Sequence, residues 1–343
     1  MFGWRVHEWA TDPVWEEIPD PVATTGEVLI EVEACAVGLT VLNCMNGNLS
    51  DDPSLLPRVP GHEVIGRVVE AGPGADTAIV GRRVAAYFYL FCGTCGECVA
   101  GHEPRCANLA GWVGVNLDGG YAPRVALPAR NVVPMPEELD PVAATVVPDA
   151  VATPVHVIGR AGIGPGDRVA VFGAGGGLGI HMIQVARHAG ATVAGLDIVD
   201  SKLAEVERLR AIPIRSDDLS SLDPDSIFAD GPPSVVVDFI GSTDSTRWAI
   251  DGLAMGGRLV SLTTFPGRDV PVAPREFVFR ELSLLGSRYA NRSELAEAGR
   301  LVASGAIEPI VGHVGGPNDV LEMHNELRTQ TLIGRGALDW SRA

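Results

Sequence analysis

The feature that most constrains the fold of this chain is a glycine-rich turn between an apolar strand and a helix. Residues 167–172 form an apolar run typical of a buried strand, and residues 178–189 have the apolar spacing of a helix. The turn between them contains Gly173, Gly175, Gly176, Gly177, Leu178 and Gly179. Such glycines let the backbone turn tightly and approach a pyrophosphate, which binds at the positive end of the helix. The turn therefore predicts a dinucleotide site, with a purely structural turn as the alternative.

The segments around this turn indicate the fold class. After about Asp149, apolar strands alternate with helix-length segments, and these strands are expected at residues 191–196, 234–239 and 258–262. Such alternation is typical of a parallel sheet covered by helices. The earlier part of the chain has β-branched segments separated by glycine and proline, at residues 26–39, 64–71 and 83–88. We therefore expect an α/β protein with a mainly β domain and a doubly wound, parallel-sheet domain.

Two charged residues beyond the glycine turn indicate which dinucleotide binds. Asp197 ends the next strand, where an acid accepts hydrogen bonds from the ribose 2′-hydroxyl. A carboxylate there repels a 2′-phosphate, so we expect NAD(H) and not NADP(H). Lys202, the only lysine in the chain, lies in the same coenzyme-binding stretch. A Schiff-base mechanism, which needs a catalytic lysine, is therefore not expected.

Four of the six cysteines crowd into one segment, at Cys92, Cys95, Cys98 and Cys106. Six cysteines in 343 residues are too few for a disulfide scaffold. Four thiolates in one compact loop are typical of structural zinc, a closed tetrahedral site with no position for substrate. Four free thiols and an iron–sulfur cluster are the alternatives, and the chain has no second cysteine set to support a cluster.

These features, together with Gly61-His62-Glu63 in the segment PGHEVIGRVVEAG and the closing LIGRG, resemble the medium-chain, zinc-containing alcohol dehydrogenase family. The resemblance implies a GroES-like catalytic domain over residues 1–151 and 288–343, with a structural-zinc lobe at about 90–110. It implies a Rossmann NAD-binding domain over residues 152–287. It also implies that Arg335, the arginine of the closing Gly-Arg, approaches the coenzyme pyrophosphate.

The same resemblance implies a catalytic zinc site, from which this chain departs. His62 and Asp149 match two zinc ligands, and Glu63 matches an acid that is a ligand or a neighbour of one. Thr40 occupies the position of the usual cysteine ligand, and a neutral hydroxyl is a poor substitute for a thiolate. A shift of register would bring Cys44 to that position. Leu42 and Met45 replace the groups of the family's proton relay.

Three functions remain open at this stage. The expected one is an NAD(H)-dependent oxidoreductase that interconverts an alcohol and a ketone or aldehyde, with His62, Asp149 and Glu63 as an atypical metal site. In the second, the chain is a zinc-free enone or quinone reductase of the same superfamily, with Thr40 donating a hydrogen bond to the substrate oxygen. In the third, it is a catalytically decayed NAD-binding scaffold.

Charge and hydropathy limit the partners and the location. The chain carries a formal charge of −17, so phosphate backbones are repelled and we expect no nucleic-acid partner. We see no apolar run that approaches the roughly 20 residues needed to span a bilayer, and expect a cytoplasmic protein with no membrane partner. The expected partners are a small alcohol or carbonyl substrate and further copies of the chain, as a homodimer or homotetramer.

Overall fold

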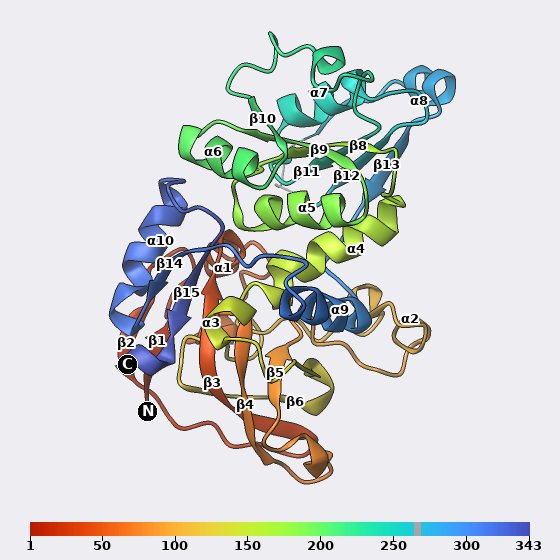
Figure 1. The fold of residues 1–343 in the computed structure, drawn as a ribbon. Helices are drawn as coiled ribbons and strands as arrows, with labels where there is room; N and C mark the ends of the chain where they lie inside the picture. The colour runs from red at the N-terminus through yellow and green to blue at the C-terminus, as the bar shows by residue number, and fades with distance from the viewer. Residues whose placement is uncertain (264–268) are drawn as a thin grey trace. The chain divides into compact units, whose positions relative to one another are not determined.

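A computed structural model describes residues 1–263 and 269–343 (Figure 1). The chain divides into two compact units. The first contains Met1–Ala152 and Ala290–Ala343, and the second contains Thr153–Tyr289. The first unit is therefore built from both ends of the chain, and the second from the middle.

The first unit contains a seven-stranded sheet with β3 at its centre. The strands are β3 (Glu27–Val37), β4 (Val64–Ala71), β5 (Arg83–Ala86), β6 (Arg124–Pro128), β7 (Val132–Pro134), β14 (Val311–Gly315) and β15 (Arg335–Asp339), in the order β14-β15-β3-β4-β5-β7 with β6 also on β3. All pairs are antiparallel except β14 with β15. A separate pair consists of β1 (Phe2–Arg5) and β2 (Val14–Glu17). Antiparallel pairing of β15 with β3 joins the C-terminal segment to the N-terminal one.

The helices of the first unit are short except near the C-terminus. They are α1 (Leu39–Met45), α2 (Gly96–Val99), α3 (Pro141–Ala144), α9 (Arg292–Ala303) and α10 (Val320–Arg328), with one π-helical turn, η5 (Val147–Val151). Single 3₁₀ turns are η1 (Pro53–Leu55), η2 (Thr77–Ile79), η3 (Glu103–Arg105), η4 (Ala129–Asn131), η7 (Pro317–Asp319) and η8 (Trp340–Arg342). The segment at residues 26–39, expected as a strand that enters a turn, forms β3 up to Val37, and Gly38 is the N-cap of α1.

The second unit is a doubly wound parallel sheet. Its strands are β8 (Arg168–Phe172), β9 (Thr192–Asp197), β10 (Ile212–Arg215), β11 (Val235–Asp238), β12 (Arg258–Ser261) and β13 (Ser283–Gly286), in the order β10-β9-β8-β11-β12-β13. The helices are α4 (Ala152–Ala161), α5 (Gly177–His188), α6 (Asp200–Arg208), α7 (Thr243–Gly252) and α8 (Pro274–Arg280), with the 3₁₀ turn η6 (Pro224–Ser226). Counted along the chain the order is 3-2-1-4-5-6, that of a Rossmann sheet. The fold class predicted from the sequence is confirmed.

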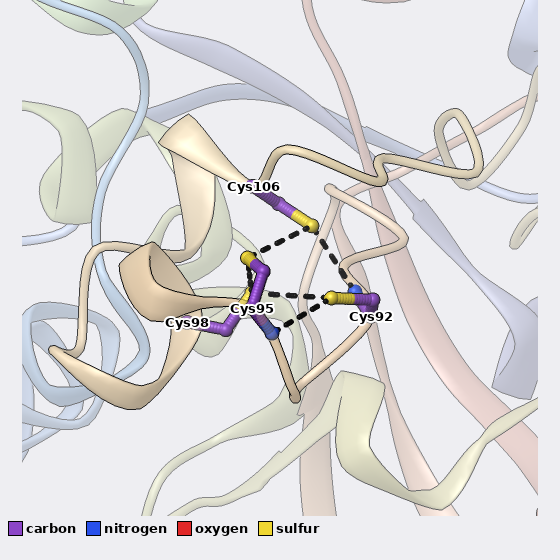
Figure 2. Close-up of side chains that lie close together, drawn as sticks. All are labelled: Cys92, Cys95, Cys98 and Cys106. Carbon is purple, nitrogen blue, oxygen red and sulfur yellow. Dashed lines mark hydrogen bonds between the residues drawn. The ribbon is translucent and has the colours of Figure 1, made fainter.

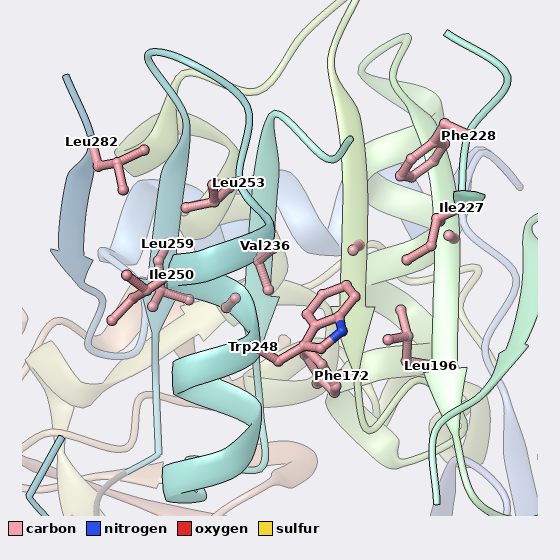
Figure 3. Close-up of a cluster of buried hydrophobic side chains, with 13 residues drawn as sticks. Phe172, Leu196, Ile227, Phe228, Val236, Trp248, Ile250, Leu253, Leu259 and Leu282 are labelled. Carbon is pink, nitrogen blue, oxygen red and sulfur yellow. The ribbon is translucent and has the colours of Figure 1, made fainter. Parts of the chain in front are cut away.

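One face of this parallel sheet is covered by a buried apolar cluster (Figure 3). The Trp248 ring of α7 meets the Phe172 ring of β8 edge-on, with centroids 5.3 Å apart. Because β8 is the strand that leads into the glycine turn, this packing fixes the base of that turn.

The expectation that no apolar run approaches membrane-spanning length is wrong. Residues Pro141–Ala161 form a helical stretch of 21 residues with mean hydropathy 1.4 in its most apolar window, long and apolar enough to cross a bilayer. Two-thirds of that window, 67%, is buried inside the protein. A core helix has the same composition, so this single stretch is weak evidence for a membrane.

Candidate functional site

The four clustered cysteines converge in the first unit (Figure 2). Their sulfur atoms are separated by 3.4 Å for Cys95–Cys98, 3.9 Å for Cys92–Cys98 and 4.0 Å for Cys95–Cys106. In a tetrahedral zinc site with Zn–S bonds of about 2.3 Å, the sulfurs lie about 3.8 Å apart. The observed separations fit that geometry.

Backbone N–H groups already favour thiolates in this lobe. The Sγ of Cys92 accepts hydrogen bonds from the backbone N–H groups of Thr94 and Cys95, at 3.4 and 3.3 Å. These bonds lower the pKa of Cys92 to about 5. Burial acts in the opposite direction at Cys98 and raises its pKa to about 12. Cys92 is thus ionised near neutral pH without a metal, whereas Cys98 ionises there only when a cation binds.

A second group that could hold a metal ion lies in the core of the first unit. Ligand atoms of His62, Glu63 and Asp149 all lie within 4.8 Å of one another, and all three residues are buried. The Nε2 of His62 is 3.6 Å from Oδ2 of Asp149, beyond hydrogen-bonding distance. Among the residues that the structure describes, neither His62 Nε2 nor Glu63 Oε2 has a hydrogen-bond partner. Two buried polar atoms without a partner, facing a third ligand, fit a cation between them.

Local backbone structure explains how this cluster forms. His62 and Glu63 precede β4, and the N–H of Ala36 on β3 bonds to the Glu63 carbonyl at 3.0 Å. Gly61 has a φ of +95°, and a Cβ there would lie 2.5 Å from the Tyr121 ring, so only glycine fits. Asp149 lies in the π-helical turn η5, a rare element that is frequent at functional sites.

Arg335 contacts both carboxylates of this cluster. Its Nε donates to Glu63 Oε1 at 3.2 Å, and its Nη2 donates to Asp149 Oδ2 at 3.1 Å. The arginine is 3% exposed. Burial raises the pKa of Glu63 above its ordinary value, although the Arg335 charge acts against this. Sequence reasoning missed this contact, because Arg335 was expected at the coenzyme pyrophosphate.

Helix α1 brings the departures from the family pattern close to this cluster. Thr40 lies half-buried on α1, two residues after Gly38, where a Cβ would lie 2.6 Å from Nη1 of Arg335. Leu42 and Met45 on the same helix are buried. Cys44 is also buried, and burial raises the pKa of its thiol to about 12. In the ranges 1–263 and 269–343, the group with metal-ligand spacing contains His62, Glu63 and Asp149 but not Cys44.

Aromatic side chains pack beside the cluster. The ring centroids of His62 and Phe88 are 4.3 Å apart, with an interplanar angle of 37°. Phe88 therefore orients the imidazole. The neighbouring Tyr87, Tyr89 and Phe91 are also buried.

The glycine turn of the second unit has the close contacts that such turns require. Gly173 has a φ of +71°, and a Cβ on Gly179 would lie 2.1 Å from the Gly173 carbonyl oxygen. A Cβ on Gly175 would lie 2.3 Å from Cβ of Lys202, which is buried. Asp197 Oδ2 accepts the N–H of Gly175 at 2.9 Å. The first turn of α5, preceded by Gly176, follows this loop, as an anion site requires.

Comparison with known proteins agrees with this architecture. The alcohol dehydrogenase GroES-like domain family matches residues 24–137, and the zinc-binding dehydrogenase family matches residues 177–304. An alcohol dehydrogenase of Geobacillus stearothermophilus is 33% identical over 299 residues, which cover 86% of each chain. The chain belongs to the medium-chain, zinc-containing alcohol dehydrogenase family.

Two further relatives of this family member are informative. An acryloyl-coenzyme A reductase of Metallosphaera sedula is 28% identical over 93% of this chain and 94% of its own length. The crystal structure of an NAD-dependent alcohol dehydrogenase, 27% identical, superimposes with a TM-score of 0.89 over 99% of both chains. This medium-chain dehydrogenase is therefore an oxidoreductase, with a GroES-like domain and a Rossmann domain as predicted.

Proposed function

We propose that this chain is an NAD(H)-dependent oxidoreductase that interconverts an alcohol and a ketone or aldehyde by hydride transfer. Its catalytic metal site is atypical, because Thr40 stands where the family has cysteine. The observation that carries this proposal is the pair of buried atoms, His62 Nε2 and Glu63 Oε2, that lack a hydrogen-bond partner among the described residues. One imidazole and two carboxylates form an acceptable zinc ligand set.

The chain's own residues have distinct roles in this reaction. His62, Asp149 and Glu63 hold the cation, and Phe88 keeps the His62 ring in place. A zinc ion held there would supply a Lewis acid for the substrate oxygen, and bound NAD(H) would supply the hydride acceptor or donor. Leu42 and Met45 cannot transfer a proton, so Thr40 or Glu63 exchanges the proton with water.

The preference for NAD(H) rests on the second unit. Residues 173–179 offer backbone N–H groups at the start of α5, where a pyrophosphate binds. The Asp197 carboxylate, fixed by the Gly175 N–H, accepts ribose hydroxyls and repels a 2′-phosphate. Lys202, packed against Gly175, adds a cation at the same loop. Arg335, which the family resemblance placed at the pyrophosphate, is buried and donates its hydrogen bonds to Glu63 and Asp149.

Structural zinc in the cysteine lobe is the second part of the proposal. Cys92, Cys95, Cys98 and Cys106 have the sulfur separations of a tetrahedral site. All four positions are taken by thiolates, so this site stabilises the lobe and takes no part in catalysis.

Association with further copies is supported by the edge of the Rossmann sheet. Strand β13 ends the strand order of that sheet, and Leu284 on it is 49% exposed. Val278 and Phe279 on the preceding helix are exposed as well. An apolar edge strand pairs readily with an identical edge across a twofold axis. We therefore infer a homodimer or homotetramer in the cytoplasm; light scattering of the wild type and Leu284→Lys tests the association.

Reduction of an activated double bond is a second candidate function. The similarity to an acryloyl-coenzyme A reductase favours it, as does the neutral Thr40 at the ligand position. In that case Thr40 donates a hydrogen bond to the enone oxygen, and no catalytic metal is needed. A catalytically decayed, NAD-binding scaffold is the alternative from another class. Tight NADH binding without turnover of any carbonyl or enone would favour the scaffold.

His62→Ala separates these functions. With a catalytic metal, the variant should lose alcohol oxidation and ketone reduction and contain one metal ion fewer per chain. With a metal-free site, it should keep enone reduction and an unchanged metal content. The exposed His7→Ala is the matched control and should resemble the wild type in both measurements. Retention of alcohol oxidation by His62→Ala would contradict the proposal.

A further inference from the structure

Two carboxylates and one guanidinium are buried together around Asp149. Glu63 is fully buried, Asp149 and Arg335 are nearly so, and together they contribute two carboxylates and one guanidinium. Charges taken out of water are costly unless they are paired and hydrogen-bonded. Arg335 supplies one positive charge to these two carboxylates, and a divalent cation held by His62, Glu63 and Asp149 would supply two more.

The Arg335 guanidinium is hydrogen-bonded to the same Asp149 oxygen that would be a ligand of the metal ion. Asp149 Oδ2 accepts from Arg335 Nη2 at 3.1 Å and is also the atom nearest His62 Nε2, at 3.6 Å. A carboxylate oxygen has two lone pairs, so both cations can reach it. Their positive charges then lie a few ångströms apart in a buried space, where repulsion is strong.

The backbone holds Arg335 in this position. Strand β15 starts at Arg335 and pairs with β3 so that Gly336 faces Val37. The next residue on that side, Gly38, is so close to the guanidinium that a Cβ would lie 2.6 Å from Nη1. The guanidinium therefore has little room to move toward α1 when a cation binds.

We propose that Arg335 is a built-in counter-cation of this site: it neutralises the carboxylates when no metal is bound and competes with a divalent cation for them. The inference rests on the proposed metal site. The competition should lower metal affinity more in this chain than at a site with a thiolate ligand, because Thr40 adds no negative charge. Removal of the guanidinium charge should therefore tighten metal binding and destabilise the metal-free protein.

Cobalt titration of the chelator-treated protein tests this inference. Co²⁺ bound to imidazole and carboxylates has visible absorption without the strong near-ultraviolet band of cobalt thiolates, so the two sites are read separately. Arg335→Gln should bind Co²⁺ at the second site about 10- to 100-fold more tightly, as expected from losing a like charge nearby. Its melting temperature without metal should fall, and metal should raise it more than in the wild type.

Matched variants keep the test independent of folding. Arg335→Lys retains the charge and should bind Co²⁺ with nearly the wild-type affinity, as should the exposed Arg342→Gln. Gly38 has a φ of −133°, so Gly38→Ala is tolerated by the backbone while its Cβ displaces the guanidinium. This variant should also tighten Co²⁺ binding.

Two negative results are distinguishable. Unchanged or weaker binding by both Arg335→Gln and Gly38→Ala, beside normal binding by the wild type, would overturn the role of Arg335 alone. Absence of a second, thiolate-free Co²⁺ site from the wild type and all variants would overturn the proposed metal site and this inference with it.

Discussion

The Tyr121 hydroxyl lies 3.1 Å from Nε2 of His324, and both side chains are fully buried. A hydrogen bond joins the phenol and the imidazole, and the second ring nitrogen, Nδ1, has no hydrogen-bond partner among the described residues. Burial lowers the pKa of His324 to about 4, and the nearby Arg328 contributes in the same direction. The folded protein therefore resists protonation here.

This lowered pKa predicts acid destabilisation. In the unfolded chain, histidine takes up a proton near pH 6.5, whereas the folded chain does so only near pH 4. The contribution of neutral His324 to the free energy of unfolding is thus fully present above pH 6.5. About 3 kcal/mol of it is lost as the pH falls from 6.5 to 4. The melting temperature should therefore fall between pH 7 and pH 5, and it should fall less in His324→Gln than in the wild type. The exposed His7→Gln is the control, and parallel losses in all three proteins would contradict the prediction.

The cysteine lobe should keep its zinc when the core site does not. Four thiolates with sulfur separations of 3.4–4.0 Å should retain zinc through dialysis, whereas His62, Glu63 and Asp149 should lose theirs to a mild chelator. Cys95→Ser should remove the lobe's zinc and lower the melting temperature by several degrees. Cys35→Ala, at a buried cysteine outside the lobe, should retain that zinc. Unchanged zinc content in Cys95→Ser, measured by mass spectrometry, would disprove the structural site.

Sequence patterns predicted the local elements of this chain well. Strand β4 covers Val64–Ala71 as expected, and β8, β9, β11 and β12 differ from expectation by a residue or so at their ends. Apolar periodicity and glycine placement are local signals, so they identify these elements. The cysteines at 92, 95 and 98 are also close enough in sequence for their convergence to be anticipated.

The contact of Arg335 with Asp149 could not be predicted in this way. It joins residues 186 positions apart and depends on how β15 pairs with β3. No local sequence pattern predicts how β15 aligns with β3. The sequence therefore shows that an arginine and an aspartate are present, but not that they are in contact. The π-helical turn around Asp149 also lacks a periodic signal. The assignment of His62, Glu63 and Asp149 to a metal came from a family resemblance, and their burial, with two ligand atoms unpartnered among the described residues, now provides a physical reason for it.

Coenzyme choice should depend on Asp197. The parent protein should bind NADH at least about 10-fold more tightly than NADPH, because a buried like-charge contact with the 2′-phosphate is strongly unfavourable. Asp197→Ser should narrow this ratio. It should also weaken NADH binding, since Gly175 loses the carboxylate that fixes its N–H. Fluorescence titration measures both, with the exposed Asp200→Ser as control. Equal affinities in the parent protein would refute the prediction.

Variants at Thr40 test whether the core site is a catalytic metal centre. It lies on α1, two residues beyond the glycine that touches Arg335, so a thiolate there adds a soft, negative ligand close to the cluster. Thr40→Cys should tighten metal binding and raise alcohol oxidation with NAD. Adding Leu42→Ser should raise it further, because a hydroxyl on α1 gives the alcohol proton a route to water.

A matched control for these variants is Thr11→Cys, which adds a thiol at an exposed threonine outside both ligand clusters and should leave alcohol oxidation unchanged. Metal content and turnover are measured together. If Thr40→Cys leaves both ketone and alcohol turnover near zero while His62→Ala spares the reduction of an activated double bond, the metal-free reductase is the correct function. We expect His62→Ala to lose all activity and Thr40→Cys to gain activity, because His62 Nε2 and Glu63 Oε2 are buried and have no hydrogen-bond partner among the described residues.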